Sequence, residues 1–171
     1  MNEKVRREIM GKVVSFYKAA GKKKRESKKI DAVTEDDYLL LYYNLFLTKN
    51  QANMLKKIFA SQLKVHTGHR KDYVMVLEST LEVLHETNSG TGTSLSVHVY
   101  EIYYFEKIIE FEMEMYGENY NALDMMFVKE LSTIINTFKE NNKEYIDEFA
   151  SKSPEEKYAA LVGAWNKTYG I

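Results

Sequence analysis

The chain has 171 residues, of which 44% are hydrophobic and 29% charged, with one proline, eight glycines and no cysteine. This composition fits a single globular domain and excludes a disulfide-stabilised fold and a thiolate metal site. The net charge of −1 hides a sharp division, because residues 1–71 hold 17 Lys/Arg against 7 Asp/Glu, and residues 72–171 hold 7 against 18. Such a division indicates either contact with nucleic acid, a membrane or a charged protein, or two halves that complement each other within the fold.

The N-terminal segment is basic throughout. Apolar residues recur at helical spacing over residues 4–20 and predict a basic amphipathic helix that ends near Gly21. It has no apolar core typical of a secretory signal, and we therefore expect a cytoplasmic protein. The connector "KKKRESKK" follows at 22–29 and is either a solvated linker or a segment that binds a polyanion. Its basic residues are the candidate binding residues for nucleic acid or an acidic protein surface: Lys22, Lys23, Lys24, Arg25, Lys28 and Lys29.

The next segment is the most apolar of the chain. Residues 35–47 are apolar nearly all round and predict a buried helix, while the run at 38–48 is too short to span a membrane. Thr48 and Gln51 form a Thr-x-x-Gln capping box, which predicts a new helix from there to about residue 65. The stretch 47–59 has the polar opening of a helix-turn-helix motif but lacks its glycine turn.

Residues 70–87 and 122–149 show clear helical periodicity, and "SPEE" at 153–156 predicts the start of a last helix. Residues 94–116 are ambiguous. Their periodicity favours a long buried helix, whereas the alternation in "SLSVHVYEI" favours a hairpin that turns at "NSGTGT". No internal repeat is evident. The sequence predicts one all-α domain over 1–171, a bundle of six or seven helices with a basic helix and connector at 1–33. The alternative is an α+β fold with a β-hairpin around 80–105.

Carboxylate and imidazole side chains flank the glycine-containing loop at 88–93. Glu82-x-x-His85 resembles one arm of the di-iron pattern in ferritin-like bundles, which needs a second such arm and two further glutamates. The second pair, His98 and Glu101, has the reverse order, which weakens this resemblance. A metal-dependent helical-bundle enzyme is therefore the alternative function, with these residues as its ligands: Glu78, Glu82, His85, His98 and Glu101.

No spacing typical of a nucleophile elbow or a phosphate-binding loop occurs. We therefore predict neither a catalytic residue, nor a metal, nor a cofactor in the favoured interpretation. That interpretation is a non-enzymatic regulatory protein that binds nucleic acid or an acidic protein surface through its basic N-terminal third. Self-association stays open.

Overall fold

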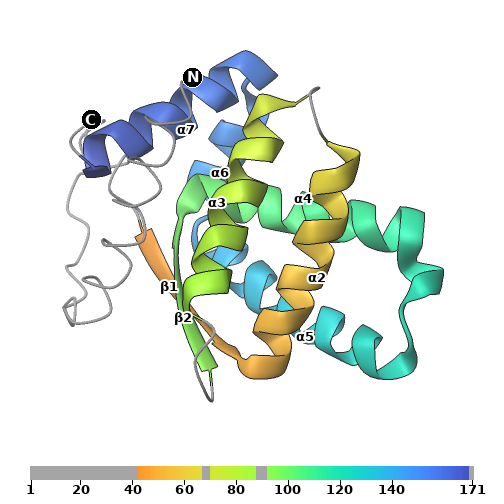
Figure 1. The fold of residues 1–171 in the computed structure, drawn as a ribbon. Coiled ribbons are helices and arrows are strands. Elements are labelled where there is room, and N and C mark those ends of the chain that lie inside the picture. Colours follow the sequence, from red (N-terminus) through yellow and green to blue (C-terminus); the bar gives the residue numbers. More distant parts are fainter. Residues whose placement is uncertain (1–41, 67–69, 88–91, 170–171) are drawn as a thin grey trace.

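The computed structural model describes residues 42–66, 70–87 and 92–169. The predicted basic helix at 4–20 and the connector at 22–29 lie outside the described residues. Six α-helices, two strands and one 3-10 turn make up the described part (Figure 1), in the order β1 (Tyr42–Thr48), α2 (Lys49–Val65), α3 (Lys71–Thr87), β2 (Gly92–His98), α4 (Val99–Tyr116), η2 (Gly117–Asn119), α5 (Ala122–Asn141), α6 (Lys143–Ser151) and α7 (Pro154–Tyr169). The fold is thus mostly helical, with a small two-stranded antiparallel sheet.

The expected helix at 35–47 is wrong in its described part, because residues 42–48 form strand β1. Burial alternates with period two along this strand: Leu45 and Leu47 are buried, while Phe46 between them is 75% exposed. Alternation of this kind is the pattern of a strand with one face on the core. In the sequence the apolar residues on both faces conceal it.

The expected single helix at 94–116 divides into a strand and a helix. Residues 92–98 form β2, and residues 99–116 form α4. The hairpin alternative was correct in placing a strand here but wrong about its partner. Strand β2 pairs with β1, with Tyr42 opposite His98 and Leu45 opposite Leu95, and not with the residues before the loop.

Capping boxes begin the helices where the sequence predicts them. The Thr48 hydroxyl accepts from the Gln51 backbone N–H at 3.2 Å, and the Gln51 side chain accepts from the Thr48 N–H at 3.0 Å. Ser153 and Glu156 make the same reciprocal pair before α7. Each box satisfies N–H groups that a helix start leaves without an intrahelical partner.

Residues 122–149 are not one helix, because the chain breaks at Asn142 between α5 and α6. Asn142 is buried, and its side-chain oxygen accepts a hydrogen bond at 2.5 Å from the Tyr43 hydroxyl of β1. Its side-chain nitrogen donates to the Phe138 carbonyl at 2.8 Å. The side chain thus takes up a carbonyl near the end of α5, and the break is held by a strand far away in the sequence.

The units β1–α2 and β2–α4 repeat one design at an offset of 50 residues. In each, a seven-residue strand runs directly into a capping box and a long helix: Thr48 and Gln51 in the first unit have His98 and Glu101 as counterparts. The sheet register has the same symmetry. Tyr42 pairs with His98, and their counterparts, Gly92 and Thr48, pair with each other as well. No repeat was evident from the sequence, because the identities over residues 42–65 are confined to the pairs Leu45/Leu95, Lys57/Lys107 and Ile58/Ile108.

Two pairs of counterparts touch, which places an approximate two-fold axis between the units. Leu45 lies opposite Leu95 in the sheet, and Gln62 donates to the Glu112 carboxylate at 2.5 Å between α2 and α4. Only residues near such an axis can contact their own counterparts. The Tyr120 hydroxyl donates to the other Glu112 oxygen at 2.7 Å, so this buried carboxylate has a donor on each oxygen.

The core lies between the inner face of the sheet and the helices packed on it. Phe59 of α2 and Phe105 of α4 are fully buried and meet edge to face with ring centroids 4.9 Å apart. Tyr104 and Phe149 extend this aromatic core toward α6. In the part of the chain that the structure describes, no helix has both the length and the apolar character needed to cross a membrane.

Candidate basic surface on helix α2

The described part of the basic N-terminal third contains no acidic residue. Residues 42–71 hold six basic side chains and neither aspartate nor glutamate. The six connector residues that the sequence singled out lie outside the described residues, so the structure does not place them. The basic residues that the structure does place lie on α2, just before α3 or at its first residue: Lys49, Lys56, Lys57, Lys64, Arg70 and Lys71.

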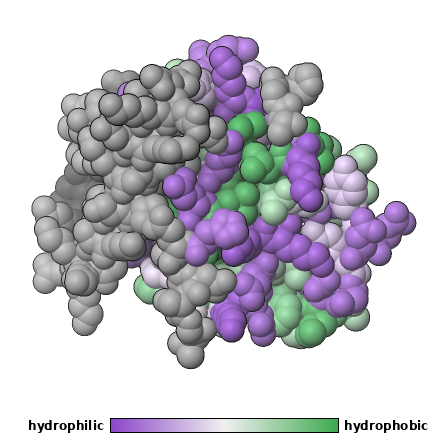
Figure 2. Space-filling model, viewed as in Figure 1, coloured by the Kyte–Doolittle hydropathy of each residue, from purple (hydrophilic) through white to green (hydrophobic). Residues whose placement is uncertain are grey.

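Helix α2 has its lysines on the side away from the core. Its buried side is set by apolar residues such as Leu55, Ile58 and Phe59, which pack under the sheet and against α4. On the opposite side, every exposed position from 49 to 64 is lysine, asparagine or alanine. Hydrophilic side chains cover much of the surface over the front helices, with smaller hydrophobic areas between them (Figure 2).

The first turn of α2 adds to this positive charge. Each of the other described α-helices has an acidic residue in its first turn, whereas α2 has none and begins with Lys49. A helix N-terminus carries a partial positive charge of about half a unit, which an acidic side chain would offset. On α2 that charge adds to the charge of the lysine.

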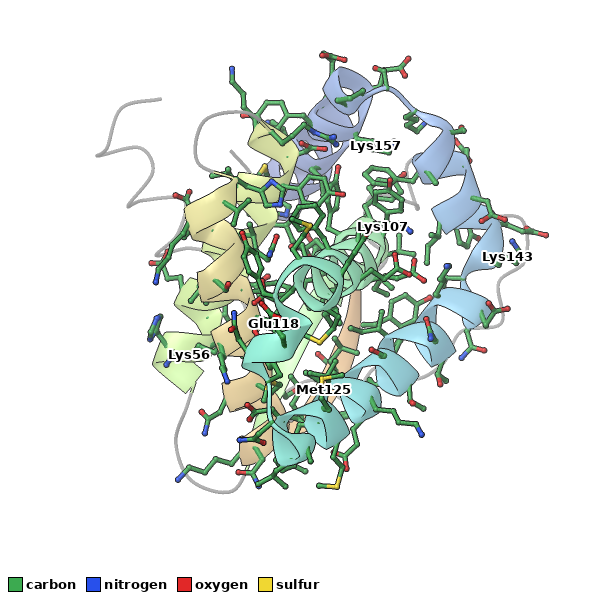
Figure 3. All side chains as sticks on the ribbon, turned by 90° about the vertical axis from the view of Figure 1, so that its right-hand side faces the viewer. Lys56, Lys107, Glu118, Met125, Lys143 and Lys157 are labelled. Carbon is green, nitrogen blue, oxygen red and sulfur yellow. The ribbon has the colours of Figure 1, made fainter. Side chains whose placement is uncertain are left out.

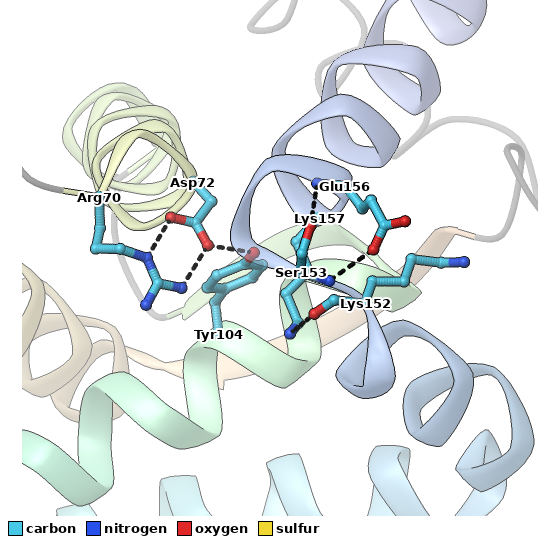
Figure 4. Close-up of polar contacts among 7 residues, drawn as sticks. All are labelled: Arg70, Asp72, Tyr104, Lys152, Ser153, Glu156 and Lys157. Carbon is cyan, nitrogen blue, oxygen red and sulfur yellow. Dashed lines mark hydrogen bonds and ion pairs between the residues drawn. The ribbon is translucent and has the colours of Figure 1, made fainter.

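Two of the basic residues are held by carboxylates and serve the fold. Lys57 bonds Asp124 of α5 at 2.9 Å and lies 4.4 Å from the centre of the Tyr120 ring. Arg70 grips Asp72 with two hydrogen bonds, at 3.0 and 2.8 Å (Figure 4). By contrast, Lys49 and Lys56 take part in no ion pair among the described residues.

The Asp72 carboxylate at the start of α3 binds both Arg70 and Tyr104 of α4, and so connects the two helices. Asp72 is 2% exposed and also accepts from the Tyr104 hydroxyl at 2.8 Å. Burial alone would raise the pKa of Asp72, but the hydrogen bonds from Arg70 and Tyr104 outweigh it and hold that pKa below its ordinary value. A carboxylate with all these donors is a structural anchor, ionised at neutral pH.

The residues of the metal alternative do not assemble into a site. His98 and Glu101 are the capping box of α4: the His98 ring nitrogen Nδ1 accepts from the Tyr100 N–H, and the Glu101 carboxylate accepts from the His98 N–H at 2.7 Å. Both side chains are buried in that role. Glu78, Glu82 and His85 lie on α3. Within the described ranges, no three His, Asp or Glu side chains are grouped so that they could hold a metal ion.

His66 begins the stretch "HTGH" at 66–69 and belongs to no group of three metal-ligating side chains among the described residues. Its Nε2 is 3.1 Å from the Gln62 side-chain oxygen, and its ring stacks on Tyr73 with centroids 5.1 Å apart. Burial lowers the pKa of His66, and the nearby Arg70 lowers it further. His69 lies outside the described residues.

A pocket of about 230 Å³ lies between α4 and α5. Its floor is apolar, with Ile109 and Ile135, and the carboxylates on its α4 side are already matched by lysines. Glu106 bonds Lys139 at 2.7 Å, and Glu110 bonds Lys107 at 2.8 Å. The pocket therefore offers no unbalanced charge and no group with evident catalytic chemistry.

Sequence reasoning missed α2 as a basic surface, because it concentrated on the dense run at 22–29. The signal was present in the spacing: Lys49, Lys56 and Lys64 recur on one side of a helix whose other side is apolar. Comparison of the chain with known protein families, curated proteins and solved structures finds no match. The functional argument therefore rests on the residues of this chain.

Proposed function

We propose that this protein is a non-enzymatic binding protein whose basic N-terminal third contacts a polyanion, either a nucleic acid or an acidic protein surface. The observation that carries the proposal is the complete absence of acidic residues from 42–71, combined with the exposed lysines of α2. A surface of one charge sign attracts an oppositely charged partner over a distance and raises the rate of association. The cysteine-free chain fits a reducing compartment such as the cytoplasm.

No observation favours the metal-dependent enzyme. Of its five candidate ligands, His98 and Glu101 are engaged in capping α4, and no metal-binding group of three forms in the described part. Metal analysis of the purified protein tests this alternative directly.

The proposal predicts that full-length protein binds nucleic acid in a strongly salt-dependent manner. Affinity should fall about tenfold or more between about 50 and 200 mM salt, because bound lysines and arginines displace counterions from phosphates. Changing the six basic residues of the connector to Gln or Ser should weaken binding and leave the melting temperature unchanged. These residues are Lys22, Lys23, Lys24, Arg25, Lys28 and Lys29. No binding at about 50 mM salt would rule out the nucleic-acid version. Co-purification of an acidic protein would then support the other.

A further inference from the structure

We propose that the exposed face of α2 docks onto the phosphate backbone of duplex nucleic acid, an inference that rests on the proposed function and assigns its structured contact surface. The helix has 17 residues, four of them lysine, and no carboxylate. Its lysines point to one side because the other side is buried against the core. A rigid helix presents these charges in a fixed arrangement.

The inference relies on two lysines of α2: Lys49, which is exposed at the start of the helix, and Lys56, which is half-buried. Neither takes part in an ion pair in the described ranges, so a phosphate would not have to displace a carboxylate from them. Lys56 reaches outward from the molecule in Figure 3, whereas Lys143 lies on the opposite side. Lys57, between α2 and α5, is already neutralised by Asp124.

The composition of the face favours phosphate over protein. Interfaces between proteins have an apolar or aromatic centre and are depleted in lysine. The exposed positions of α2 show the reverse: they are lysine, asparagine and alanine, apart from Val65 at the end of the helix, which is 40% exposed. Lysine and asparagine are among the side chains that bond phosphate oxygens, and such contacts require no particular base sequence.

The spacing of the lysines favours a duplex over a single strand. Lys56 lies seven positions after Lys49, which corresponds to about 10.5 Å along the helix axis at 1.5 Å per residue. The major groove of B-form DNA is about 12 Å wide. Lys49 and Lys56 can therefore reach phosphates on the two sides of one groove. In a single strand no groove fixes this spacing.

The test compares two charge-matched variants of the full chain. Lys49→Gln/Lys56→Gln removes two lysines from the α2 face. The control, Lys107→Gln/Lys143→Gln, removes two lysines that are paired with Glu110 and Asp147. Both variants have the same net charge, so a general charge effect would appear equally in both. Thermal unfolding verifies that each variant is folded. Binding to a fluorescent DNA duplex of two to three helical turns, and to one of its single strands, is measured over a series of salt concentrations.

We expect the α2 variant to bind the duplex about tenfold or more weakly at about 100 mM salt, and the slope of log affinity against log salt to fall by about 2. The control should stay within about threefold of the wild type, since its lysines make no phosphate contact. Wild-type binding with equal loss in both variants would overturn the α2 assignment and leave the proposed function to the connector. Equal affinity for the single strand would overturn the duplex assignment. Binding of an acidic protein alone would overturn this inference while the proposed function stands.

Discussion

At the scale of single residues, Glu101 of the α4 capping box is an acidic side chain in a buried position. Glu101 is 2% exposed and accepts a hydrogen bond from the His98 N–H. Burial raises the pKa of Glu101 to about 7, although that hydrogen bond acts in the opposite direction. The folded state therefore binds this proton more tightly than the unfolded state does. The stabilisation is complete below the ordinary pKa of 4.5 and is lost as the pH rises through 7.

Glu101→Gln should therefore make stability less dependent on pH. The amide keeps an acceptor for the His98 N–H and never ionises, so the variant should exceed the wild type in free energy of unfolding by up to about 3 kcal/mol at pH about 8. The advantage should vanish near pH about 4.5. Urea denaturation across this range measures it.

Glu156→Gln is the matched control, because Glu156 has the same place in an exposed capping box and its pKa lies below its ordinary value, chiefly through the hydrogen bond from the Ser153 backbone. It should show no gain at high pH. A constant difference between wild type and Glu101→Gln at all pH values would contradict the assignment of the titration to Glu101.

At the scale of elements, the pairing of β1 with β2 holds the two repeated units together. The register places Phe46 opposite Ser94, and both side chains are exposed. The chain has no cysteine of its own, so introduced cysteines report this pairing without interference.

Phe46→Cys/Ser94→Cys should form an intramolecular disulfide on mild oxidation, because residues directly opposite each other in a sheet have Cβ atoms about 4.5–5.5 Å apart. The control Asn44→Cys/Ser94→Cys places the cysteines on a diagonal, at about 7–8 Å, and should cross-link far less. Mass spectrometry of a proteolytic digest identifies the linked peptides. Equal cross-linking of both pairs would contradict the register.

The capping boxes show what the sequence could predict. The hydroxyls of Thr48 and Ser153 accept hydrogen bonds from backbone N–H groups only three residues further along the chain. A short stretch of sequence therefore contains both partners. Helices α2 and α7 accordingly begin at the predicted residues. Helix α3, predicted from periodicity over 70–87, also lies within one residue of that range.

Features that depend on distant partners could not be predicted in this way. Strand β1 is a strand because β2, about 50 residues later, pairs with it. The break at Asn142 depends on Tyr43, which is 99 residues away. The lysine face of α2 could have been found from periodicity, but which lysines are paired could not. Only the fold brings Asp124 to Lys57.

At the scale of the whole molecule, the division of charge follows the repeat. Helix α2 has four lysines and no acid, whereas its counterpart α4 has five glutamates and one lysine. At six equivalent positions of the two helices the charge is more negative in the second unit: Lys49 corresponds to Val99, Gln51 to Glu101, Lys56 to Glu106, Ala60 to Glu110, Gln62 to Glu112 and Lys64 to Glu114. Two units of one design have thus acquired surfaces of opposite character.

The ion pairs between the described basic residues and the acidic remainder are local or partly exposed. Lys57 pairs with Asp124 of α5 and is half exposed, whereas Arg70 pairs with Asp72, its neighbour in the sequence. Exposed pairs contribute at most about 1 kcal/mol each. We infer that the charges of Lys49 and Lys56, which take part in neither pair, serve a partner.

The urea denaturation midpoint of the full chain, measured at about 50 and 500 mM sodium chloride, tests this claim most directly. Salt screens exposed charges that are more than about 8 Å apart at physiological ionic strength, and this screening distance becomes shorter as the salt concentration rises. If the basic third serves a partner, the midpoint should stay unchanged or rise slightly, since salt relieves the repulsion among like charges on each surface. A clear fall of the midpoint at high salt would show that the basic third is bound to the acidic part of its own fold, and would contradict the proposed function.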